Sequence, residues 1–196
     1  MGAGQLAEEA GDQGRSLKVR AFFGLPLPDE HRAAYASALL GATTLAPRWR
    51  WTRVENLHLT IRFLGQVELA TAERIAGRVA ASGPRAFALQ LGGLDAFKRG
   101  RLASVLWVGL QLGVEEVTAL AAGVEAECAR EGLEAEKRPY RPHMTLARAR
   151  EHEGAPIPRL AVPELPPWRA GELVLFRSQL GRSGPVYEPL RSISLR

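Results

Sequence analysis

The sequence predicts an α+β fold in which antiparallel β-sheets are covered by helices on one face. Two stretches, residues 56–65 and 141–148, alternate apolar and polar side chains with the period of two that is typical of a half-buried strand. Three other stretches carry apolar residues at helical spacing, and several predicted strands follow one another with no helix between them. Strands that follow directly favour antiparallel pairing, and therefore α+β over an alternating α/β architecture.

The elements are expected in the order β-α-β-α-β-β-α-β-β-β. Proline and glycine residues define most of their ends; Pro26 ends the first strand and Gly132 occupies the position after the third helix. Glycines and basic residues at 92–101 predict a flexible loop, and five prolines within 151–167 predict a surface loop. The predicted ranges are strand 18–25, helix 30–41, strand 56–65, helix 68–81, strands 87–91 and 105–110, helix 114–131, strand 141–148, and strands 171–179 and 187–195.

Length and composition indicate one soluble domain over residues 17–196, preceded by a flexible tail at 1–16. The formal net charge of +5 and the pI near 10.0 favour an anionic partner such as RNA or a phosphorylated small molecule. A single cysteine excludes an internal disulfide and favours a reducing compartment, so we expect a cytoplasmic protein. No signal-peptide pattern is present, and no apolar run approaches the roughly 20 residues that span a bilayer.

The two alternating stretches share a His-x-Thr pattern. In the first, His58 and Thr60 lie on the polar face; in the second, His143 and Thr145 do. The two histidines are 85 positions apart, close to half the chain, which suggests an old duplication. If the two strands meet, two imidazoles face each other, each beside a hydroxyl.

Such a set can carry out acid–base chemistry on a phosphate. An imidazole has an ordinary pKa of about 6.5, so near neutral pH one ring can be the base and the other the acid. The threonine hydroxyls, with Arg141 or Arg62, would donate to phosphate oxygens and stabilise charge in the transition state. Strict alternation puts Arg148 on the face opposite His143.

The other residues that could carry chemistry have simpler structural roles. A zinc site lacks a third and a fourth ligand at typical spacing, so no metal is expected. Cys128 falls on the apolar stripe of a helix and is expected to fill the core, while His31 and His152 are structural or surface residues. Candidates for stacking on RNA bases are aromatic side chains near the motifs: Phe22, Trp107, Tyr140 and Tyr187.

The two motifs resemble the signatures of the 2H phosphoesterase superfamily. With residues 20–26 (RAFFGLP), 57–65 (LHLTIRFLG), 105–109 (VLWVG) and 187–190 (YEPL), the chain is similar to the bacterial RNA 2′,3′-cyclic phosphodiesterases, formerly 2′-5′ RNA ligases, over about residues 18–195. The resemblance implies a bilobal, duplicated fold with two antiparallel sheets facing a central cleft and helices outside. It also implies metal-independent chemistry without a cofactor, with His58 as proton donor and His143 as proton acceptor.

The implied reaction is hydrolysis of RNA 2′,3′-cyclic phosphodiester ends to 2′-phosphomonoesters. The expected partners are RNA ends or nucleotides bearing a 2′,3′-cyclic phosphate, bound by a monomer that does not associate with membranes. Two alternatives stay open: 2′-5′ ligation at the same site, or an RNA-binding module without turnover. The expected substrate-binding side chains are Arg141, Arg62, Arg20, Phe22 and Tyr187.

Overall fold

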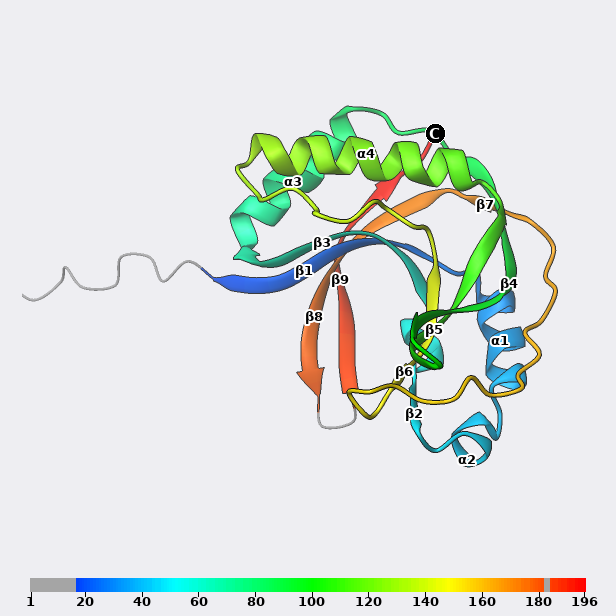
Figure 1. Ribbon diagram of the computed structural model, residues 1–196. Coiled ribbons are helices and arrows are strands. Elements are labelled where there is room, and N and C mark those ends of the chain that lie inside the picture. The colour runs from blue at the N-terminus through cyan, green and yellow to red at the C-terminus, as the bar shows by residue number, and fades with distance from the viewer. Residues whose placement is uncertain (1–16, 182–183) are drawn as a thin grey trace, which may run out of the picture.

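The computed structural model describes residues 17–181 and 184–196 (Figure 1). The predicted tail at 1–16 lies outside the described residues. In chain order, the elements are β1 (Lys18–Pro26), α1 (Asp29–Ala38), α2 (Ala42–Leu45), β2 (Trp49–Trp51), η1 (Val54–Asn56), β3 (His58–Glu68), α3 (Leu69–Ala81), β4 (Phe87–Arg99), β5 (Leu102–Leu112), α4 (Val114–Arg130), β6 (Met144–Ala149), β7 (Trp168–Ala170), β8 (Glu172–Gly181) and β9 (Gly184–Ser194).

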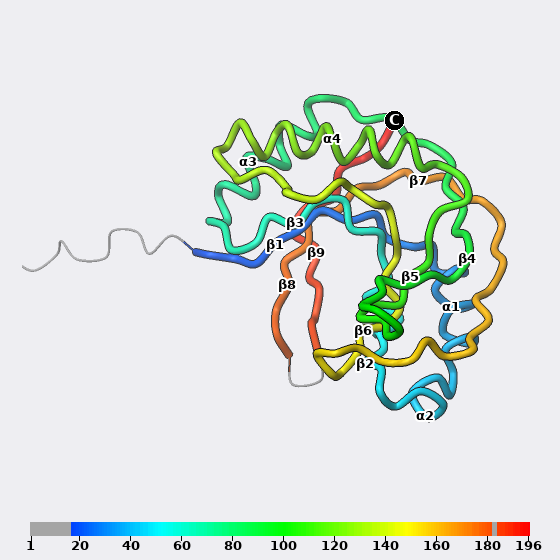
Figure 2. The backbone as a smooth tube through the Cα atoms, viewed as in Figure 1, coloured from blue at the N-terminus to red at the C-terminus, as the bar shows by residue number. Residues whose placement is uncertain are grey.

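The strands form one antiparallel sheet in the order β7-β4-β5-β6-β3-β1-β8-β9, with β2 beside β6. The predicted α+β class is therefore confirmed, but the expected two sheets are one continuous, curled sheet (Figure 2). The motif strands β3 and β6 are neighbours at its centre, and a single pair, Leu59 with Met144, joins them. One half of the sheet thus ends on β3 and the other half begins on β6.

Helices α3 and α4 pack on each other and cover β1, β3 and β9 (Figure 1). Their buried stripes follow the predicted spacing, with Ile75 and Val79 in α3 and Val124 and Cys128 in α4. Burial raises the pKa of the Cys128 thiol to about 11, which suits a core residue. No helix in the described part of the chain is long and apolar enough to cross a bilayer.

The segment predicted as a flexible loop at 92–101 is mostly strand. β4 and β5 form a long hairpin whose turn lies at Gly100, where φ is +61°. The pairing shifts between Leu91 and Leu94, so Gly92 and Gly93 occupy an irregular place within the strand instead of ending it. A bulge accommodates glycine at small cost, and this explains why the prediction was wrong there.

Each motif strand contains an extra residue directly after its threonine. In β3, Thr60 pairs with Gly24 and Arg62 with Phe23, so Ile61 has no partner on β1. In β6, the pairing with β5 likewise skips Leu146. An extra residue reverses the alternation of side chains beyond it. The face that carries the histidines, called here the histidine face, therefore gains different residues from those that strict alternation predicts.

Candidate active site

The structure brings His58, Thr60, His143 and Thr145 together on the histidine face. Because Leu59 pairs with Met144, His58 lies opposite Thr145 and Thr60 lies opposite His143 in the antiparallel register. The two imidazoles therefore occupy one diagonal of a square and the two hydroxyls the other. The positive charge of a protonated His143 lowers the pKa of His58, as expected for neighbouring rings.

Both imidazoles are held in the same way. Nδ1–H of His58 donates to the carbonyl of Asn56 at 2.7 Å, and Nδ1–H of His143 donates to the carbonyl of Arg141 at 2.7 Å. A carbonyl oxygen only accepts, so each contact fixes the tautomer and leaves Nε2 available for proton exchange. In His58 that nitrogen accepts from the Thr60 hydroxyl at 2.9 Å.

Aromatic rings enclose His58. Its ring lies 4.8 Å from that of Phe22, 5.3 Å from that of Tyr187 and 6.2 Å from that of Phe176. A Cβ atom on Gly24, which pairs with Thr60, would come within 3.1 Å of the His58 ring. The glycine therefore leaves the space that the imidazole occupies.

His143 rests against a second aromatic pair. Phe97 and Trp107 approach its ring edge-on at 5.1 Å and 5.8 Å. The guanidinium of Arg141 lies over the Trp107 ring at 4.6 Å and pairs with Asp95 at 3.5 Å. Arg141 is thus beside His143, as predicted, with its charge partly offset by a carboxylate.

Burial lowers the pKa of both histidines. For His58 the value falls to about 4, mainly by loss of hydration and further through the charges of His143 and Arg148, against the opposing effect of the Asn56 carbonyl. For His143 the shift has the same direction, with burial first and the charges of Arg148 and Arg141 after it. Both rings are therefore neutral near pH 7 in the free protein.

This shift predicts a stability that depends on pH. The unfolded chain protonates His58 near pH 6.5 and the folded protein only near pH 4, so stability is lost as the pH falls through this window. The loss is about 3 kcal/mol at full shift. Urea unfolding between pH 4 and 7 measures it, and His58→Asn, which cannot titrate, should flatten the curve. Equal slopes for the two proteins would contradict the assignment.

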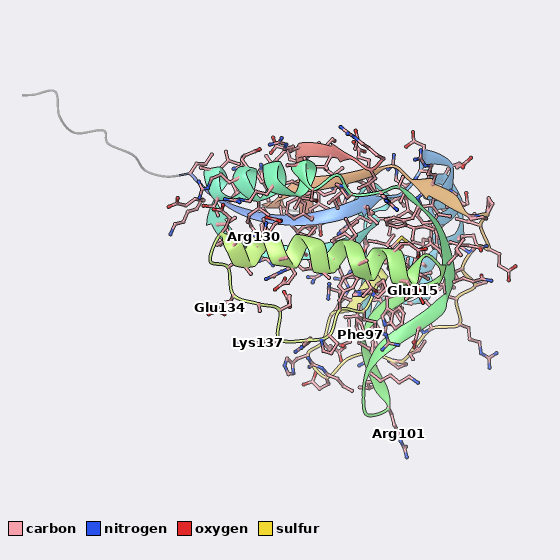
Figure 3. All side chains as sticks on the ribbon, turned by 90° about the horizontal axis from the view of Figure 1, so that it is seen from above. Phe97, Arg101, Glu115, Arg130, Glu134 and Lys137 are labelled. Carbon is pink, nitrogen blue, oxygen red and sulfur yellow. The ribbon has the colours of Figure 1, made fainter. Side chains whose placement is uncertain are left out.

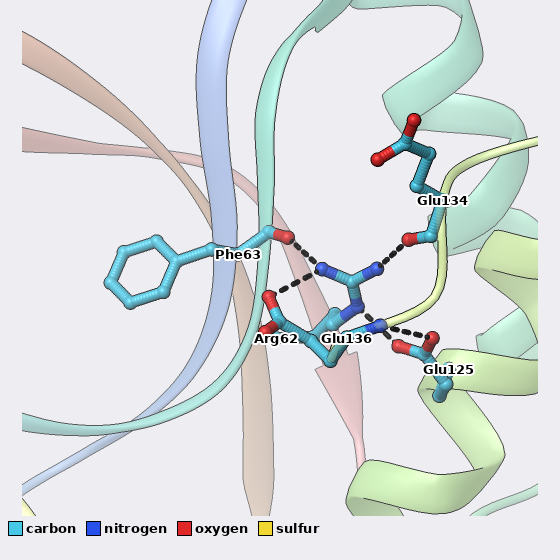
Figure 4. Close-up of polar contacts among 5 residues, drawn as sticks. All are labelled: Arg62, Phe63, Glu125, Glu134 and Glu136. Carbon is cyan, nitrogen blue, oxygen red and sulfur yellow. Dashed lines mark hydrogen bonds and ion pairs between the residues drawn. The ribbon is translucent and has the colours of Figure 1, made fainter. Parts of the chain in front are cut away.

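Arg62 does not lie at the site, contrary to the prediction. The extra residue at Ile61 turns the Arg62 side chain away from the histidine face and toward the helices. Arg62 is only 8% exposed there. It pairs there with Glu125 of α4 and with Glu136, and it donates to the carbonyls of Phe63 and Glu134 (Figure 4). Arg62 is therefore a structural residue that ties β3 to α4 and the segment after it.

Arg148 is the functional candidate that strict alternation missed. The extra residue at Leu146 turns it onto the histidine face, where its charge adds to the effect of burial in lowering the pKa of His58 and His143, and opposes the rise that burial causes in the pKa of Tyr187. The only signal in the sequence is positional: Arg148 and Phe63 each stand five residues after a motif histidine.

The other predicted contacts divide into two groups. Tyr187 is half-buried beside His58, and burial raises its pKa against the opposing charges of Arg148 and the exposed Arg20, so both Tyr187 and Arg20 lie near the site. Phe22 is only 1% exposed, so its ring packs against His58 and is not free to stack on an RNA base. Trp107 is similarly buried against His143, and the Tyr140 hydroxyl donates to the carbonyl of Thr60 at 2.9 Å.

Two further features bear on ligands. Within residues 17–181 and 184–196, no three His, Cys, Asp or Glu side chains gather in a way that could hold a metal ion. A cavity of about 600 Å³ lies between α3, α4 and the start of β4, and none of its lining residues belongs to the histidine face.

Comparison with known proteins identifies the family. The model of the 2′-5′ RNA ligase superfamily matches residues 31–182. The chain belongs to this superfamily. Among superfamily relatives, the RNA 2′,3′-cyclic phosphodiesterase of Aeropyrum pernix is 32% identical over 71% of this chain and 82% of its own. That of Escherichia coli is 31% identical over 90% of this chain and 96% of its own.

Solved structures of the 2′-5′ RNA ligase superfamily share the fold. Escherichia coli LigT complexed with 3′-AMP superposes with a TM-score of 0.75 at 26% identity, over 91% of this chain and 99% of that one. TT0787 of Thermus thermophilus gives a TM-score of 0.75 at 28% identity, over 90% and 98%.

Proposed function

We propose that this protein hydrolyses RNA 2′,3′-cyclic phosphodiester ends to 2′-phosphomonoesters without a metal ion. The observation that carries the proposal is the pair of imidazoles with one tautomer, on the same face of the sheet and beside the charge of Arg148. The names of the relatives and the 3′-AMP bound to Escherichia coli LigT support the same substrate class. Residues 17–196 act as one domain in which each duplicated half supplies one histidine.

The reaction is an in-line displacement at phosphorus. Nε2 of His143 accepts a proton from water, and the water oxygen bonds to phosphorus. The bond from phosphorus to the 3′ oxygen breaks, and Nε2 of His58 donates a proton to that oxygen. Thr60, Thr145 and Arg148 donate to the non-bridging oxygens, where charge develops.

Substrate binding also prepares the acid. In the free protein Nε2 of His58 accepts from the Thr60 hydroxyl and its pKa is about 4, so the ring is neutral near pH 7. A bound phosphate adds negative charge and raises that pKa. It also accepts from Thr60 in place of the imidazole. His58 therefore gains its proton together with the substrate.

The test uses adenosine 2′,3′-cyclic phosphate in the presence of excess EDTA. We expect conversion to the 2′-monophosphate, which chromatography separates from the 3′ isomer. Loss of turnover with EDTA would overturn the metal-independent mechanism. Binding without conversion would favour the RNA-binding module. A 3′-monophosphate product would mean that the bond from phosphorus to the 2′ oxygen breaks, and would contradict the proposed step.

A further inference from the structure

A second arginine stands next to Arg148 on the histidine face. The short strand β2 pairs antiparallel with β6, and Arg50 lies directly opposite Arg148 in that register. Directly opposite residues point to the same face of a sheet. The neighbours of Arg50 in β2, Trp49 and Trp51, turn the other way, and Trp49 is in the core. Arg50 therefore projects from the histidine face and is exposed.

The two arginines end a row that crosses four strands. Phe97 pairs with Val105, Val105 with Arg148, and Arg148 with Arg50. Across the sheet, two apolar residues are therefore followed by two positive charges. Phe97 lies near the tip of the β4–β5 hairpin, and Figure 3 shows Arg101 at the tip itself. The next row, through Trp107 and Thr145, belongs to the catalytic set. The two rows are adjacent.

This positive pair has no acidic partner in the part of the chain that the structure describes. Glu151 pairs with Arg48, and Asp95 pairs with Arg141, while neither Arg50 nor Arg148 forms an ion pair. Like charges directly opposite each other on a sheet destabilise it. Two guanidinium groups in this arrangement therefore suit an anionic ligand that binds between or across them.

We propose that Arg50 binds the next phosphate of an RNA strand, the phosphodiester on the 5′ side of the terminal nucleoside. The proposal rests on the proposed function, because it takes the reacting phosphate to lie between the two imidazoles. The partly exposed ring of Phe97, backed by the buried Val105, provides the apolar surface beside which the ribose or base of the terminal residues lies. The site is then built for RNA ends of two or more nucleotides.

The reacting phosphate already has donors other than Arg50. Its two non-bridging oxygens already have three donor side chains, Thr60, Thr145 and Arg148, and the two histidines serve the water and the leaving oxygen. Arg50 stands one strand spacing, about 5 Å, farther along the row. A separate phosphate is the remaining acceptor that a linear RNA strand supplies on this side.

The test compares a cyclic mononucleotide with a dinucleotide that ends in a 2′,3′-cyclic phosphate. In Arg50→Ala, the ratio of kcat/KM for the dinucleotide to kcat/KM for the mononucleotide should fall about tenfold, mainly through KM, as for one lost charge-assisted hydrogen bond. The slope of log affinity against log salt for the dinucleotide should become shallower by about 0.7. Arg50→Lys should restore part of both.

Arg169 in β7 is the matched control, because Arg169→Ala removes one exposed positive charge from a strand beside β4, on the edge of the sheet. It should leave the ratio and the salt slope unchanged. An unchanged ratio in Arg50→Ala, or an equal fall in Arg169→Ala, would overturn the proposal. If the wild type converts neither nucleotide, the proposed function fails, and the salt slope of dinucleotide binding still decides the role of Arg50.

Discussion

Replacing either His58 or His143 by alanine should reduce turnover of a cyclic-phosphate-ended RNA by about 10²–10⁴-fold. In the proposed mechanism each ring supplies one proton transfer, and general acid or base catalysis contributes on this scale. The two side chains act as a unit, so the double variant should be little slower than either single variant. Steady-state rates with a cyclic dinucleotide measure both effects.

His152 provides the control for these substitutions. It is an exposed loop histidine, and only its backbone carbonyl accepts a hydrogen bond, from Arg99. His152→Ala should therefore keep the wild-type rate. Thermal unfolding of all variants separates lost chemistry from lost folding. Wild-type rates in purified, folded His58→Ala or His143→Ala would end the assignment.

Replacing Arg62 by methionine should destabilise the fold by about 3 kcal/mol. The substitution leaves the carboxylates of Glu125 and Glu136 unpaired and removes two donors to backbone carbonyls. Breaking a buried ion pair costs about 3–5 kcal/mol, and the lower end applies because both glutamates keep some contact with water. Urea unfolding at pH 7 gives the value.

Arg148→Met is the matched comparison, since it removes the same group from an exposed position. Arg148→Met should unfold at about the same urea concentration as the wild type but lose turnover. Arg62→Met should lose stability but keep turnover while it is folded. The reverse pattern, with Arg62→Met stable and inactive, would return Arg62 to the active site and contradict the hydrogen bonds of Figure 4.

Periodicity predicted the regular parts of this fold well. The stripes of α3 and α4 and the first strand lie where the sequence placed them, because each buries one face over several turns or pleats. The motif strands lie within three residues of their predicted ends: β3 begins at His58, and β6 begins at Met144, so residues 141–143 precede the strand predicted to contain them. Strands β2 and β7 were not predicted. Each has three residues, too few for a pattern, and each depends on a partner that is distant in sequence.

The sequence could not have shown that Arg148, and not Arg62, lies on the histidine face, for a related reason. A bulge is defined by pairing with another strand, and nothing in the residues around Ile61 or Leu146 indicates which position is left without a partner. The four motif side chains precede the bulges, so alternation placed them on one face as the structure does. Each arginine follows a bulge and was assigned to the wrong face.

Backbone carbonyls fix the same tautomer in both imidazoles. Because Nδ1 donates to the carbonyl two residues earlier in both motifs, neither ring is chemically committed to giving or to receiving a proton. In the proposed reaction, the orientation in which the nucleotide binds would therefore help to set which ring gives the proton and which receives it. Under the proposed function, the side chains that orient the ribose would then take part in deciding which ester bond breaks.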